Sequence, residues 1–160
     1  MATKLKDHSA PAAPANGPAQ ADDFAAWAFH QAALLRSGQF HLLNAAEIAE
    51  ELDGLGRGEF NDLVSQLRIV LLHLLKWDHQ PSRRSRSWAA SVAEHRVRIA
   101  TVLEDNPSLK PRREHAVQRA YQQARLSAAR ETRLHEHEFP EACPYDWEVI
   151  TARPITFETR

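Results

Sequence analysis

Residues 71–88 read LLHLLKWDHQPSRRSRSW, and this stretch decides the fold. Its first residues are the end of a strongly apolar segment. Pro81, which cannot continue an α-helix, follows them, and a run of arginines comes next. The segment before it, from about Glu59 to Trp77, repeats apolar residues at helical spacing over a wide face. We therefore predict a central helix over residues 59–77 that packs against neighbours on two sides.

Two shorter helices are predicted before the central one. An apolar stripe over residues 24–35 follows a pair of acids that can cap a helix, and Gly38 ends it. Asn44 stands three residues before Glu47, which is the spacing of a capping box. Three closely spaced glycines then predict a sharp turn before the central helix: Gly54, Gly56 and Gly58.

Two further helical patterns follow the arginine run. They cover residues 88–104 and 109–131, and Asp146 can cap a short last turn. No strand pattern competes, so we predict an all-α fold, a single-domain bundle of about five helices. The side chains expected to be buried are Trp27, Phe60, Leu67, Leu71, Leu74, Trp88 and Ile99.

Composition sets the expected organisation of the chain. Its 160 residues suit one domain. Residues 1–21 are rich in Ala and Pro and predict a disordered tail, residues 22–150 a helical domain, and residues 151–160 a C-terminal tail. A single cysteine, Cys143, excludes an internal disulfide and indicates a reducing compartment. Without a signal peptide or a long apolar run, we expect a cytoplasmic protein that does not enter a membrane.

The net charge of −1 conceals a segregated distribution. Residues 81–133 hold 12 Lys and Arg against 5 Asp and Glu, whereas residues 1–80 hold 6 against 10. Such asymmetry indicates either a surface that binds a polyanion or helix faces that neutralise each other within the fold.

The order of several segments resembles a known bacterial family, domain of unknown function twenty-nine (DUF29). The matching segments include DFAAWAFHQAALLRSGQF, AEELDGLGRGEF, LRIVLLHLLKWDHQPSRRSRSW, IATVLEDNPSLKP and FPEACPYDWEVI, which together span residues 22–150. The resemblance implies a small, all-helical cytoplasmic protein. It implies no activity, since the family has no established one.

A candidate metal or polar site consists of Glu50, Glu51 and His73. Carboxylates and an imidazole on facing helices are how helical bundles bind metal ions, so these residues predict a site for a divalent metal. The alternative is structural: Glu51 pairs with a nearby arginine, and His73 bonds a carboxylate.

A related acidic pattern faintly resembles the magnesium-binding motifs of helical nucleotide pyrophosphohydrolases. Magnesium prefers a few carboxylates plus water, which such a pattern supplies. The spacing between its two halves is short, and no phosphate-binding signature accompanies it. The pattern consists of Glu47, Glu50, Glu51, Glu59 and Asp62.

The arginine run supplies a second candidate site, for a polyanion. Basic side chains interleaved with aromatics can bind phosphates and stack on bases, with Trp77 as a candidate surface aromatic. The alternative is that the tryptophans belong to the core and that the arginines neutralise the acidic second helix. The basic candidates are Lys76, Arg83, Arg84 and Arg86.

Three functions follow from these patterns. The leading hypothesis is a helical interaction module without its own catalysis, acting through a protein partner or self-association, because apolar stripes are ample and no complete catalytic set is present. The alternatives are a metal-dependent enzyme on nucleotides or phosphoesters using Glu50, Glu51 and His73, and nucleic-acid binding through the arginines at 83–86.

Overall fold

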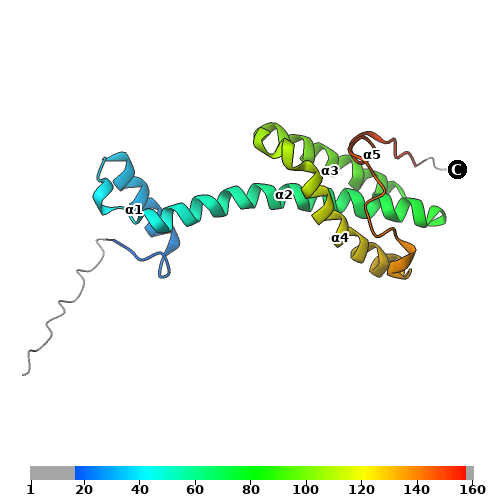
Figure 1. Ribbon diagram of the computed structural model, residues 1–160, viewed down its shortest axis with the longest axis horizontal. Helices are drawn as coiled ribbons and strands as arrows, with labels where there is room; N and C mark the ends of the chain where they lie inside the picture. Colours follow the sequence, from blue (N-terminus) through cyan, green and yellow to red (C-terminus); the bar gives the residue numbers. More distant parts are fainter. Residues whose placement is uncertain (1–16, 158–160) are drawn as a thin grey trace, which may run out of the picture. The chain divides into compact units, whose positions relative to one another are not determined.

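The computed structural model describes residues 17–157, which form two compact units. Unit 1 ends at Asp53, and unit 2 begins at Gly54. The α-helices are α1 (Phe24–Arg36), α2 (Ala45–His79), α3 (Arg86–Asp105), α4 (Arg113–Thr132) and α5 (Trp147–Ala152), joined by short 3-10 helices (Figure 1). Residues 17–157 contain no strand, so the predicted all-α fold is confirmed. Of the predicted N-terminal tail, residues 1–16 lie outside the described residues.

Unit 1 is built from α1 and the start of α2. The side chain of Asp23 caps α1 by accepting from the Ala26 N–H at 2.9 Å, and Gly38, with φ +72°, follows its end, as predicted. The Asn44 side chain accepts from the Glu47 N–H, which confirms the predicted start of the next helix. Residues 17–21, the end of the predicted tail, reach this unit, because Gln20 donates to Glu51.

The predicted turn at the three glycines is wrong. Residues 45–79 form one continuous helix, so the expected second helix and the expected central helix are both parts of α2. Glycine permits a turn but does not require one, because helical φ values remain accessible to it. None of Gly54, Gly56 and Gly58 has a positive φ.

We expect the double substitution of Gly56→Ala and Gly58→Ala to stabilise the protein. A Cβ at either position would meet nothing within 4 Å, and alanine is favoured over glycine inside a helix by about 0.5–1 kcal/mol per site. Urea unfolding followed by circular dichroism measures the gain. Gly38→Ala is the control of opposite sign, because its positive φ strains any other residue. Destabilisation by the double substitution would mean that a turn forms here.

Unit 2 contains the main hydrophobic core, which α2 supplies from Phe60 onward. Its side chains at Leu63, Leu67, Val70, Leu71, Leu74 and Leu75 are fully buried. The helices α3 and α4 pack along this part of α2, and small alanines on α4 bring the helices close (Figure 1). The role predicted for residues 59–77 is therefore confirmed. Other members of the core are Val92, Ile99, Val102, Leu103, Leu109, Ala116, Ala120, Tyr121, Ala124, Ala128, Phe139 and Ile150.

Candidate functional site

The structure does not bring the predicted metal ligands together. Glu50 and Glu51 belong to unit 1 and His73 to unit 2, and all three lie on the single helix α2. Within residues 17–157, no group of three or more His, Cys, Asp and Glu side chains is placed to hold a metal ion.

Three acids of the related magnesium pattern, Glu51, Glu59 and Asp62, have other partners. Glu59 accepts from the side-chain amide of Asn106 at 2.9 Å, and Asp62 accepts from that of Gln66 at 2.7 Å. Glu51 accepts from Gln20. These carboxylates therefore serve as ordinary hydrogen-bond acceptors along α2.

His73 lies on the flank of the core and is kept neutral by its surroundings. Its ring centroid is 6.4 Å from that of Trp88, and its Nδ1 atom is buried without a hydrogen-bond partner among the described residues. Burial first, and then the positive charge of Lys76, lower the pKa of His73 from 6.5 to about 4, although Glu131 opposes them. An imidazole that resists protonation in this way packs as an apolar ring.

We expect His73 to make the protein less stable in mild acid. Below pH 6.5 the unfolded chain binds a proton that the folded His73 refuses, so stability falls as the pH drops from about 6.5 towards 4. His73 is only partly buried, so we expect the loss to be about 1–2 kcal/mol. Urea unfolding at pH 7.5 and pH 4.5 measures it.

The matched variants are His73→Leu and His41→Leu, since His41 is exposed. His73→Leu should remove this part of the acid sensitivity, whereas His41→Leu should leave it unchanged. Equal pH dependence in the wild type and His73→Leu would contradict the low pKa.

Two members of the predicted polyanion cluster are engaged inside unit 2. Lys76 is buried, donates to Glu131 at 2.7 Å, and lies 4.5 Å from the centre of the Trp88 ring. Arg84 donates from Nε to the backbone oxygen of Trp77 at 2.9 Å and stacks over the Trp77 ring. The Lys76 ammonium and the Arg84 guanidinium therefore already bind partners within unit 2.

The other two members of the cluster, Arg83 and Arg86, are exposed. Trp77 is only 6% exposed, so its assignment as a surface aromatic is wrong: α2 turns this side chain into the protein, and Arg84 covers it. Trp88, expected in the core, is partly buried.

Asp78 forms a polar network with two other side chains of unit 2. Its two carboxylate oxygens accept from Arg153 at 2.6 and 2.8 Å, and one of them also accepts from the Tyr145 hydroxyl at 2.9 Å. Burial raises the pKa of Asp78, but the hydrogen bonds from Arg153 and Tyr145 and the nearby arginine charges outweigh it, so the net pKa is lowered. The network fixes Arg153, part of the predicted C-terminal tail, against the end of α2.

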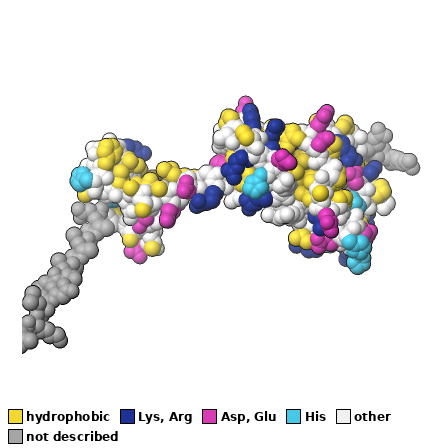
Figure 2. Space-filling model, in the orientation of Figure 1, with side chains coloured by type: hydrophobic (Ala, Val, Ile, Leu, Met, Phe, Trp, Pro, Cys, Tyr) yellow, Lys and Arg dark blue, Asp and Glu magenta, His cyan; other side chains and the backbone are white. Residues whose placement is uncertain are grey.

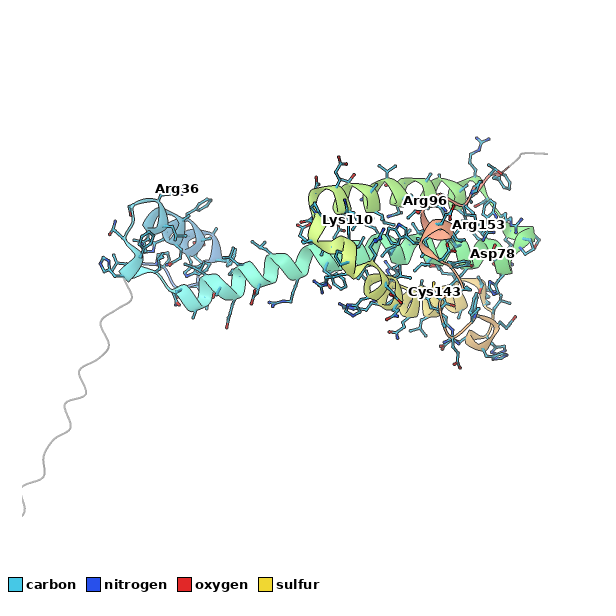
Figure 3. The ribbon with its side chains drawn as sticks, turned by 45° about the horizontal axis from the view of Figure 1, so that its top comes forward. Arg36, Asp78, Arg96, Lys110, Cys143 and Arg153 are labelled. Atoms are coloured by element: carbon cyan, nitrogen blue, oxygen red, sulfur yellow. The ribbon has the colours of Figure 1, made fainter. Side chains whose placement is uncertain are left out.

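Arg96 of α3 holds the same segment from the other side. Its guanidinium donates to the backbone oxygens of Val149, Ile150 and Arg153, at 3.0, 2.7 and 2.7 Å. Figure 3 shows Arg96, Arg153 and Asp78 near one another, beside α5. A cation at the C-terminal end of a helix also complements its dipole. The sequence analysis did not predict these contacts of Arg96, Arg153 and Asp78, because the three residues are far apart in the chain.

A groove of about 760 Å³ lies between the start of α4 and residues 141–150. Val117, Tyr121 and Ile150 contribute apolar surface, while charged side chains of both signs, including Lys110 and Glu141, line it as well. Cys143 also lines it (Figure 3), and burial raises the pKa of this thiol, which makes it a poor nucleophile. The groove therefore provides space for a ligand without an activated catalytic group at Cys143.

Unit 1 exposes most of its large apolar side chains. Within residues 17–53, only Trp27 and Leu34 among them are buried, and Phe29 is 76% exposed. Figure 2 shows hydrophobic side chains gathered on the surface of this unit. Isolated exposed apolar residues are ordinary, but here six of them belong to one small unit. We call this set the apolar surface of unit 1: Phe24, Phe29, Leu35, Phe40, Leu42 and Leu52.

Comparison with known proteins supplies a family. The chain matches the family model described as "Domain of unknown function DUF29" over residues 21–154. No curated protein and no solved structure matches it. None of the described helices is both long and apolar enough to cross a membrane. Because the match covers most of the chain, including both units and the Asp78–Arg153 pair, the protein belongs to the DUF29 family.

Proposed function

We propose that this protein is a helical interaction module of the bacterial cytoplasm and that it binds a protein partner through the apolar surface of unit 1. The observation that carries the proposal is the exposure of that surface. Six large apolar side chains of unit 1 face solvent, against two that are buried. Covering them would release water from apolar area, which is the main driving force of protein association.

The charge of unit 1 indicates the kind of partner. Residues 17–53 contain six Asp and Glu side chains and one arginine. Two copies of such a surface would repel each other, whereas a basic partner would be attracted and steered to it. A basic amphipathic helix, with apolar residues on one face and lysines on the other, meets both requirements.

A cytoplasmic location agrees with the cysteine content. The chain has one cysteine, Cys143, which is free and partly buried. A protein that needs no disulfide suits a reducing compartment.

The test is binding to a designed probe. A fluorescent amphipathic peptide with lysines on its polar face is titrated with the protein, alongside a peptide that keeps the apolar residues and replaces lysine by glutamate. We expect the basic peptide to bind more tightly. Phe29→Ser should weaken its binding roughly 10- to 100-fold, because a buried Phe side chain contributes about 1.5–3 kcal/mol.

Leu126→Ser is the matched control, since Leu126 is 57% exposed but lies on α4 of unit 2. Its binding should equal that of the wild type. Equal affinity for both peptides, or no effect of Phe29→Ser, would contradict the proposal. The alternative occupant of the apolar surface of unit 1 is a second copy of this chain. Sedimentation over a range of protein concentrations tests for it. A dimer that Phe29→Ser abolishes would mean that a second copy, rather than a basic partner, covers this surface.

A further inference from the structure

Two arginines and a histidine near the start of α4 surround one aromatic ring of α2, that of Phe60. Arg112 lies immediately before the helix, and Arg112, His115 and Arg119 share one of its faces at spacings of three and four residues. The Arg112 and Arg119 guanidinium carbons lie 4.1 and 5.6 Å from the centre of the Phe60 ring. The His115 ring stacks on Phe60 at 5.3 Å between centroids. Phe60 is 3% exposed, so these side chains cover it.

The Phe60 ring positions the Arg112 and Arg119 guanidinium groups without neutralising their charge. Within residues 17–157 the ion pairs are Lys76–Glu131, Arg98–Glu94, Arg125–Glu136 and Arg153–Asp78, and none involves Arg112 or Arg119. The adjacent acid on α2, Glu59, bonds the Asn106 amide instead. A cation–π contact uses no N–H group as a hydrogen-bond donor, so guanidinium groups over an aromatic ring can still donate to an anion.

The start of α4 is also electrostatically unfavourable as it stands. Lys110, Arg112 and Arg113 lie at its N-terminal end, where the helix dipole is positive, and the first turn contains one acid, Glu114. Among the described residues, no side chain caps this helix start. A bound anion would reduce the repulsion among Lys110, Arg112 and Arg113. It would also reduce the repulsion between these side chains and the positive end of the helix dipole.

We propose that Arg112, His115 and Arg119 form a binding surface for the phosphodiester backbone of a nucleic acid. The guanidinium fork matches a phosphate group. A polymer fits better than a single phosphate, because the positive charge continues beyond the three residues: Lys110 and Arg113, both exposed, lie beside them at the start of α4. Figure 2 shows Lys and Arg side chains gathered on unit 2 near the start of α4.

The buried state of Phe60 determines the mode of binding. Its ring is covered, so it cannot stack on an unpaired base. The surface therefore contacts phosphates and reads no sequence, and its affinity should fall steeply with salt. This site lies on α4 and Phe60, and differs from the predicted cluster at 83–86, where Lys76 and Arg84 are already engaged.

The test is fluorescence anisotropy with a labelled 20-base-pair DNA duplex at several salt concentrations. We expect the logarithm of the binding constant to fall linearly with the logarithm of the salt concentration. In the double variant Arg112→Gln and Arg119→Gln, the slope should shrink by about 2, since each phosphate contact contributes about 0.9. Arg98→Gln is the control, because Arg98 is exposed and already pairs with Glu94. Phe29→Ser should leave DNA binding unchanged, which separates this site from the apolar surface of unit 1.

A second variant separates charge from packing. Arg112→Lys with Arg119→Lys keeps both charges, and the wild-type slope should remain even if the glutamine variant is poorly folded. The proposal is overturned if the glutamine variant, shown to be folded by its melting curve, keeps the wild-type slope, or if Arg98→Gln reduces the slope equally. Polyglutamate that displaces DNA at equal charge concentration would also overturn it, in favour of an acidic protein.

Discussion

Leu71→Ala is expected to lower the free energy of unfolding by about 2–5 kcal/mol, because it removes most of a fully buried side chain from the centre of the core. Leu71 lies on the part of α2 that α3 and α4 cover, so the surrounding helices cannot close the resulting cavity without moving one another. Urea unfolding at pH 7, followed by circular dichroism, measures the loss.

Leu52→Ala is the matched control on the same helix. Leu52 is 62% exposed, so the same truncation should change stability by less than about 0.5 kcal/mol. A loss below 1 kcal/mol for Leu71→Ala would show that the core of unit 2 is not centred on α2.

The second large effect is expected at Asp78. Asp78→Asn should destabilise the protein by about 2 kcal/mol at pH 7, because it removes a bidentate contact with Arg153 and leaves that guanidinium without its carboxylate. The side chains are about 30% exposed, which keeps the effect below that of a fully buried pair. Asp62→Asn is the control, since Asp62 is exposed and accepts only from Gln66.

Acid should abolish this difference between the wild type and Asp78→Asn. The pKa of Asp78 is lower in the folded protein than in the unfolded chain, so its contribution is fully present above the unfolded value of about 3.8. It is lost as the pH falls through the folded pKa. Unfolding curves of both proteins between pH 6 and pH 2 should therefore converge below pH 4. A constant gap across this range would contradict the lowered pKa.

Hydrophobic periodicity was sufficient to predict most helices of this fold. The stripe at residues 88–104 corresponds to α3, and the pattern at 109–131 corresponds to α4 with the 3-10 helix before it. Asp146 caps α5, as its position suggested. These predictions succeeded because burial on one side of a helix leaves a regular local pattern.

The break expected in α2 shows the limit of local signals. Three glycines disfavour a helix by about 1 kcal/mol each, yet a helix already formed on both sides adds one backbone hydrogen bond for each residue it continues. The prediction that Glu51 and His73 lie on facing helices depended on that break. Because the helix is continuous, both residues lie on the same helix and cannot face each other across a bundle.

Long-range contacts were beyond local reasoning for a different reason. Asp78 and Arg153 are 75 residues apart, and Arg112 meets Phe60 across two helices. Tertiary packing determines which residue becomes such a partner. No pattern in a single sequence indicates which of several arginines will contact Asp78. The burial of Trp77 likewise depends on how α2 rotates against its neighbours.

Asp78 and Arg153 are far apart in the sequence, so the parts of unit 2 that they join leave the ribosome at different times during synthesis. The apolar side of α2 is synthesised well before Phe139 and Ile150, the last residues to join its core. A nascent chain that ends between these points carries an unfinished core, which is the surface that chaperones bind and proteases attack. Completion of unit 2 therefore depends on release of the chain through residue 150, and premature termination before residue 139 should direct the product to degradation.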